Sequence, residues 1–328
     1  MVEAYEAVAI GEVMGLLDPE SSGPLEDVSH FRLRVAGAEG NVLINLSHLG
    51  HSTAFVSAVG ADPLGRLVTR TLAEQGVDIR HVSIDPTRRT GVFFKERLGD
   101  AERRVHYYRE GSAASCLGPE QLDLDRLGAP KVVTLSGVTL GLGGVTGLSA
   151  AAREVLAWAS GQPSTVVFDP NLRPALWYGA RAAAEFAEIL PQIDVLLTGR
   201  DELAQLMPTL PLDDAARRLC DAGLTAVVLK DGARGAVVHD GRRATRIEAY
   251  PVGAAAIDPV GAGDAFAAGV ISGLLHGWPV RDGARVGAVL GARAVTISGD
   301  WEPVASGDDA EHLLQEYLSV FGVVGERA

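Results

Sequence analysis

The chain has 328 residues, 47% of them hydrophobic, which suffices for one large or two ordinary domains with a substantial core. Its 29 basic and 42 acidic residues give a net charge of -13, which excludes a general attraction to nucleic acid or to an anionic membrane. The acidic start, the lack of a long apolar run and two isolated cysteines, Cys116 and Cys220, predict a cytoplasmic protein without signal peptide or membrane span.

Two early regions, at about residues 12–36 and 90–110, differ in pattern from the rest of the chain. In the second region, residues 91–98 and 103–108 flank Gly99 and Asp100, which is typical of a β-hairpin. We expect a small antiparallel sheet beside a larger one. Such a sheet suits a lid that excludes water from a site, and the alternative is an ordinary edge hairpin.

The rest of the chain alternates short β-branched runs with longer amphipathic stretches. The expected strands are 131–136, 165–169, 195–197 and 226–229, and the expected helices lie near 149–160, 180–190, 213–222, 264–276 and 282–297. This alternation predicts an α/β fold, a mainly parallel sheet with helices on both faces and ligands at the carboxyl ends of its strands. Because the sequence has no repeat or linker, we expect one domain over residues 1–328 that includes the lid segments.

The stretch Asp258–Phe266 is the most informative one, because it predicts an anion site with its own base. The first N–H groups of the following helix lack partners, and strained backbone at Gly261 and Gly263 would let amides approach an oxyanion. The helix end favours ionised Asp264, so that with a pKa near 4 this carboxylate can accept a proton from an attacking hydroxyl group. The alternative is that Asp264 only caps a helix.

The best-known phosphate-binding motifs are missing. Lys95, Lys131 and Lys230 are followed by Glu, Val and Asp, so no Walker-type Gly-Lys-Ser/Thr is present and a P-loop kinase is excluded. The stretch 141–147 has Thr146 where a dinucleotide-binding fingerprint needs its third glycine, and we interpret it as a loop.

Three segments resemble motifs of the ribokinase-like, or PfkB, carbohydrate kinase family. Asp258–Asp264 resembles its C-terminal signature, Gly37–Asn41 followed by Leu49 and Gly50 resembles its N-terminal motif, and Lys230–Gly235 resembles its nucleotide-side loop. The resemblance covers nearly the whole chain. It implies a Rossmann-like core with a β lid, ATP and Mg²⁺ as cofactors, transfer of the γ-phosphoryl group to a sugar hydroxyl, and a homo-oligomer, dimer or higher, through the lid.

The same resemblance implies roles for individual residues. Asp264 would be the general base, and Gly261, Ala262 and Gly263 would form the anion hole. The nucleotide would be bound by Lys230, Gly232 and Gly235 together with Gly261 and Gly263.

Within the family, segments 106–115, 169–177 and 298–302 resemble those of members that phosphorylate 2-keto-3-deoxygluconate. Arg109 and Arg173 each offer a planar fork that suits a carboxylate, which favours an acidic sugar over fructose or ribose. The remaining residues expected at the sugar are Gly37, Asn41, Tyr107, Asp264 and Asp300.

Metal handling departs from the family pattern. Glu202 is expected to act on Mg²⁺ through water, although Gly199 replaces the usual asparagine, and Asp258 is expected to help hold a monovalent cation such as K⁺, although Pro259 replaces the common threonine. The eight histidines show no metal-ligand spacing.

Other functions stay open at this point. Fructokinases carry very similar residues at 169–173, so a fructokinase or other neutral-sugar kinase is the first alternative. A kinase that also accepts the galactonate epimer is a second, and a catalytically silent sugar sensor is a third. The retained base and signature glycines favour an enzyme over a sensor.

Overall fold

The computed structural model describes residues 5–99, 103–174, 176–177, 180–241, 243–253, 258–302 and 309–322. Within these residues a ten-stranded sheet has the order β14-β13-β12-β11-β10-β9-β1-β4-β5, and β6 also pairs with β4. Neighbours from β4 to β12 are parallel, and β13 and β14 add an antiparallel hairpin at one edge. The mainly parallel sheet that the alternation predicts is thereby confirmed.

The strands of this sheet are β1 (Ala7–Ile10), β4 (Thr53–Gly60), β5 (Val77–Asp78), β6 (Val82–Asp85), β9 (Val132–Ser136), β10 (Thr165–Asp169), β11 (Val195–Gly199), β12 (Ala226–Lys230), β13 (Ala236–His239) and β14 (Ala244–Ile247). The helices are α1 (Ala38–His48), α2 (Pro63–Glu74), α3 (Gly137–Leu140), α4 (Leu148–Ser160), α5 (Ala180–Ile189), α6 (Arg200–Leu206), α7 (Leu212–Asp221), α8 (Ala262–Leu275), α9 (Val280–Ala294) and α10 (Ala310–Phe321).

Helices cover both faces of the sheet because its central strands are apolar on both sides. Along β1, Ala7 and Ala9 pack into the core that contains α1, α2, α8, α9 and α10, whereas Val8 and Ile10 pack into the core of α3 to α7. Side chains alternate along a strand, so β1 alone contributes to two cores. Helix α8 lies close against α9, where Gly269 meets the backbone of Gly287, and this packing fixes the direction of α8.

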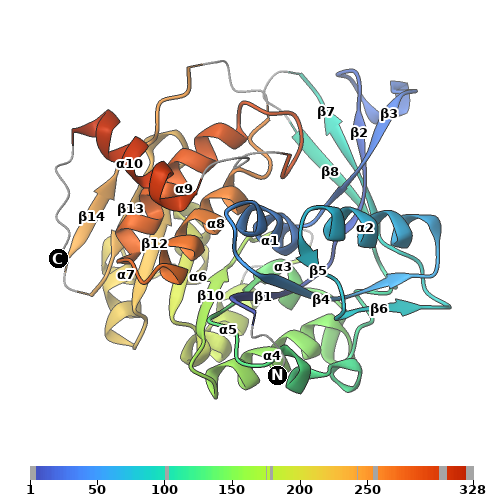
Figure 1. Ribbon diagram of the computed structural model, residues 1–328, viewed down its shortest axis with the longest axis horizontal. Helices are drawn as coiled ribbons and strands as arrows, with labels where there is room; N and C mark the ends of the chain where they lie inside the picture. The colour runs from blue at the N-terminus through green and yellow to red at the C-terminus, as the bar shows by residue number, and fades with distance from the viewer. Residues whose placement is uncertain are drawn as a thin grey trace.

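A second sheet of four strands stands off one end of the first (Figure 1), in the order β3-β2-β7-β8. Its strands are β2 (Met14–Pro19), β3 (Phe31–Ala36), β7 (Val92–Arg97) and β8 (Arg103–Tyr108), which confirms the hairpin around Gly99. The expectation that this sheet is antiparallel is wrong for one pair of strands. Strands β2 and β7 are parallel, because the chain passes through α1, β4 and α2 before it returns to the sheet.

The expected helices lie within three residues of their observed bounds. One difference matters for function: α8 begins at Ala262, so Asp264 lies inside its first turn rather than at its start. In the described part of the chain, no helix has the length and apolar character needed to cross a bilayer. The single domain over residues 1–328 stays a prediction.

Candidate active site

Two cavities meet at the amino end of α8. The first, of 640 Å³, lies between the carboxyl edge of the large sheet and the small sheet. The second, of 630 Å³, lies beyond it, toward β13 and α9, and its lining includes Gly232, Gly235 and Ala288. Three residues line both cavities: Lys230, Pro259 and Gly263. Pro259 and Gly263 belong to the short turn at the start of α8, which we call the anion-binding turn. A molecule in either cavity therefore reaches this turn.

This turn has the form that an anion site needs. Gly261 has φ of 84°, in the left-handed region, and a side chain there would collide with the main-chain oxygen of Asp300. The Ala262 amide donates to the Pro259 carbonyl at 3.3 Å, which leaves the amides of Gly263 and Asp264 at the open end of the helix. The expectation of strained backbone at Gly263 is wrong, since this residue is helical. Because Gly263 has no side chain, it leaves the amides at the open end of the helix uncovered.

Asp264 lines the first cavity beside this turn. The Nδ2 of Asn41 donates to its Oδ2 at 2.7 Å. Burial raises the pKa of Asp264 to about 7, the carboxylates of Asp169 and Asp300 add to the rise, and the Asn41 hydrogen bond and Arg173 oppose it. The expected pKa near 4 is therefore wrong. The helix end and Asn41 do not compensate for the loss of water and for two neighbouring carboxylates.

Lys230 connects the ends of two strands. Its ammonium donates to Asp169 at 2.5 Å, across the end of β11, where Gly199 has no side chain to intervene. Burial alone would lower the pKa of Lys230, but the carboxylates of Asp169 and Glu202 outweigh it and raise that pKa. A side chain built on Gly263 would lie 3.9 Å from Nζ. The chain thus holds a fixed positive charge where the two cavities meet.

The two arginines predicted to meet a substrate carboxylate differ in the structure. Arg109 lines the cavity but is buried, and its Nε and Nη2 both lie 2.7 Å from Glu12 Oε2. Ser112 donates to the other oxygen of Glu12 at 2.5 Å. The carboxylate of Glu12 thus takes one side of the Arg109 guanidinium, and a contact of Arg109 with a substrate stays a prediction. Arg173 lines the same cavity, is exposed, and its guanidinium makes no hydrogen bond or ion pair among the described residues.

Other predicted sugar contacts also line the first cavity. Tyr107, 36% exposed, reaches it from β8, with its ring 5.6 Å from that of Phe93 and the Arg109 guanidinium 5.3 Å away. Gly37 lies where a side chain would collide with the Glu12 carbonyl. Asn41 is buried, and its side chain holds the carboxylate of Asp264 through a hydrogen bond.

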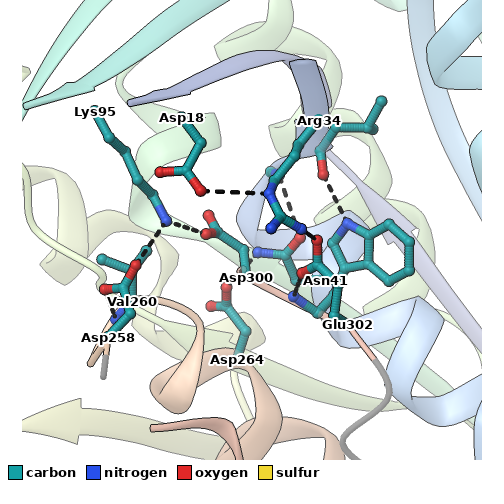
Figure 2. A network of polar contacts seen from close by, with 12 residues as sticks. Asp18, Arg34, Asn41, Lys95, Asp258, Val260, Asp264, Asp300 and Glu302 are labelled. Carbon is teal, nitrogen blue, oxygen red and sulfur yellow. Dashed lines mark hydrogen bonds and ion pairs between the residues drawn. The ribbon is translucent and has the colours of Figure 1, made fainter. Parts of the chain in front are cut away.

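Asp300 and Asp258 share a partner that the sequence does not predict (Figure 2). The buried ammonium of Lys95, on β7, forms an ion pair with Asp300 Oδ1 and lies 3.2 Å from Asp258 Oδ2. The other oxygen of Asp258 accepts the Val260 amide at 3.1 Å. Potassium at Asp258 does not fit this arrangement, because a cation from the chain is already in contact.

Magnesium fits the site more simply. Among the described residues no three His, Cys, Asp or Glu side chains form a metal cage, but Mg²⁺ usually takes one or two carboxylates and completes its shell with phosphate and water. Glu202 lines the first cavity, where its two oxygens accept the amides of Leu172 at 2.9 Å and Gly199 at 2.7 Å. Both oxygens keep lone pairs for a metal-bound water.

Four charged residues that line the first cavity were not among the predicted site residues: Glu12, Glu39, Lys95 and Asp169. For Lys95 a signal existed, since residues two apart share a face of a strand and Lys95 shares that of Phe93. Asp169 follows an apolar strand at the sheet edge where ligands bind. No pattern in the neighbouring sequence distinguishes Glu12 as a site residue.

The fold and the paired cavities define an enzyme that brings an anionic donor to an acceptor at a helix terminus. The chain belongs to the pfkB family carbohydrate kinases, whose pattern matches residues 5–305. It is thus an ATP-dependent sugar kinase.

Relatives agree over nearly the full length. The 2-dehydro-3-deoxygluconokinase of Thermoproteus tenax is 34% identical over 312 residues, 94% of either chain. The 2-dehydro-3-deoxygalactonokinase of Haloferax volcanii is 31% identical over 318 residues, 94% of this chain and 96% of its own. The crystal structure of a PfkB protein from Polaromonas sp. has a TM-score of 0.81 and 35% identity, covering 89% of this chain and 96% of that one.

Proposed function

We propose that this kinase transfers the γ-phosphoryl group of ATP to 2-keto-3-deoxygluconate, also called 2-dehydro-3-deoxygluconate, and forms 2-keto-3-deoxy-6-phosphogluconate. The observation that carries the proposal is the meeting of two cavities at Lys230 and Gly263, beside the carboxylate of Asp264. The sugar acid would occupy the cavity under the small sheet, and ATP the cavity lined by Gly232 and Gly235.

Asp264 would act as the general base. It takes the proton of the attacking hydroxyl group as the new oxygen–phosphorus bond forms and the bond to the departing ADP breaks. Asn41 holds the carboxylate in place through the 2.7 Å hydrogen bond. The amides of Gly263 and Asp264 and the ammonium of Lys230 would neutralise charge on the transferring group, with Gly261 and Ala262 shaping the turn. Mg²⁺ would be held through Glu202 and water, and it would supply positive charge that neutralises the phosphate groups of ATP.

A pH profile tests the base. Because the pKa of Asp264 is about 7 and the base works only when unprotonated, activity must fall as pH drops through that value. We expect kcat/KM for the sugar acid to decrease about tenfold per pH unit well below pH 7 and to level off above it. Initial rates over the range of about pH 5 to 9 measure this. A kcat/KM that stays constant from about pH 9 down to about pH 5 would contradict a base with this pKa.

Arg173 would recognise the substrate carboxylate, since it is the exposed arginine of the cavity and its guanidinium makes no hydrogen bond or ion pair in the described residues. We expect Arg173→Ala to raise KM for the sugar acid about 10- to 100-fold, the value of a charge-assisted hydrogen-bond pair, and to leave KM for ATP unchanged. Arg109→Ala is the matched control. Because its fork holds Glu12, that change should lower thermal stability more than Arg173→Ala does. Equal KM values in Arg173→Ala and wild type would exclude Arg173.

One assay tests the substrate. ADP release with Mg-ATP is measured against 2-keto-3-deoxygluconate, its galactonate epimer, fructose, ribose, adenosine and fructose 6-phosphate. We expect the highest kcat/KM with a keto acid. The relative named for the galactonate epimer makes that sugar the second candidate. Faster release with fructose would overturn the acid-sugar proposal, and no release with any acceptor would favour a sensor.

The small sheet would serve as the lid over the sugar, since Tyr107 and Lys95 reach the cavity from it. A homo-oligomer through this sheet is supported by its outer strands β3 and β8, which expose Leu33 by 50% and Tyr108 by 63%. Light scattering coupled to gel filtration measures the mass of the particle in solution, and a monomer at all concentrations would contradict the proposed oligomer.

The free thiols of Cys116 and Cys220 support a cytoplasmic location.

A further inference from the structure

Lys95 is among the largest fully buried side chains of the described residues, and it is a charged one. Its ammonium reaches from β7 of the small sheet to the carboxylates of Asp258 and Asp300 (Figure 2), which come from segments 163 and 205 residues further along the chain. Moving an ammonium ion out of water is costly unless it is paired. The burial of a lysine in this position therefore needs an explanation in terms of structure or function.

Both partners of Lys95 shape the anion-binding turn. Asp258 Oδ1 accepts the Val260 amide at 3.1 Å, which fixes the first residues of the turn. The main-chain oxygen of Asp300 packs against Gly261, the left-handed residue immediately before α8. A cation that holds these two carboxylates together thus holds both sides of the turn whose amides, in the proposed function, would bind the transferring phosphoryl group.

The charge balance also requires a cation here. Asp258 and Asp300 are 1% and 6% exposed, and without a counter-charge their two carboxylates would repel each other and disturb the turn. Burial alone would lower the pKa of Lys95, but the carboxylates of Asp300 and Asp258 outweigh it and raise that pKa. Lys95 is therefore charged at neutral pH and supplies the positive charge that a bound potassium ion would otherwise bring.

We propose that the Lys95 ammonium is a built-in monovalent cation that positions the anion-binding turn, so that phosphoryl transfer needs no added potassium. This inference replaces the potassium ion expected at Asp258 and rests on the proposed kinase function. Because Lys95 belongs to β7, the same contact ties the small sheet to the turn. Lys95 is a positioning residue, since its ammonium contacts the carboxylates of Asp258 and Asp300, whereas the reaction would take place at Asp264 and Gly263.

The first experiment measures wild-type turnover while KCl replaces tetramethylammonium chloride at constant ionic strength, which keeps screening equal. We expect turnover to change by less than about twofold.

The second experiment uses Lys95→Met, which removes the charge and keeps a long apolar side chain. Its kcat should fall about 10²-fold, as for a small displacement of catalytic groups, and ammonium or potassium ions should restore a large part of it. Lys131→Met, at an exposed lysine paired with Glu6, is the matched control and should behave as wild type.

Thermal unfolding gives a readout that does not depend on activity. An ion that binds the vacated position stabilises the native state, so NH₄⁺ or K⁺ should raise the melting temperature of Lys95→Met more than that of wild type or Lys131→Met. Absence of turnover in wild type with every sugar would refute the proposed function and leave this test in force. A folded Lys95→Met that gains neither stability nor turnover from these ions would overturn the inference. So would a wild type that potassium activates about tenfold, and this titration decides the matter if Lys95→Met does not fold.

Discussion

Asp264→Asn is expected to fold, to bind sugar and ATP, and to lose about 10³-fold or more in kcat. Loss of a general base typically costs about 10² to 10⁴ in rate, and Asp264 is the carboxylate of the cavity that lies beside the exposed amides of α8. An asparagine keeps the shape and can still accept the hydrogen bond from Asn41. Steady-state ADP release gives kcat, and calorimetric titration with the sugar gives binding. Near-wild-type turnover would remove Asp264 as the base.

The same variant should be more stable than wild type above neutral pH. Because the pKa of Asp264 is raised to about 7, the folded state holds a proton that the unfolded chain has released between about pH 4 and 7. Stability therefore falls as pH rises through this window, and the full cost of the buried charge is present above it. Asparagine removes that cost. Melting curves at about pH 8 should show the increase, whereas Asp213→Asn, at an exposed aspartate in the first turn of α7, should change neither stability nor kcat.

What the sequence predicts well is local. The strands, the hairpin and the start of α8 are predicted by periodicity and by turn residues that lie only a few positions apart. The signature at Asp258–Asp264 predicts an anion site from equally local residues. These segments meet at the carboxyl edge of a parallel sheet, so their gathering into one site is predicted along with the fold.

What the sequence does not predict depends on pairs distant along the chain. Arg109 looks fully available for a substrate in the sequence, but Glu12, 97 residues earlier, takes one side of its guanidinium. The raised pKa of Asp264 depends on burial and on carboxylates from β10 and from the segment after α9. Such terms follow from tertiary packing, and no property of the Gly-Ala-Gly-Asp segment itself contains them.

Lys230→Met is expected to lower kcat about 10²- to 10³-fold with little change in sugar binding. The Lys230 ammonium lines both cavities and is held by Asp169 at 2.5 Å, so its charge is fixed where the phosphoryl group would pass. Charge fixed before the reaction acts mainly on the transition state, so that its removal should reduce kcat more than it raises KM.

Removal of Lys230 also leaves Asp169 without its partner, which alone would destabilise the fold. The double variant Lys230→Met with Asp169→Asn removes both charges, and it should recover thermal stability without recovering kcat. Lys131→Met controls for the loss of one positive charge at an exposed site. If the double variant regained both stability and turnover, Lys230 would serve only to neutralise Asp169. If it regained stability alone, the missing activity would measure what the Lys230 charge contributes to phosphoryl transfer.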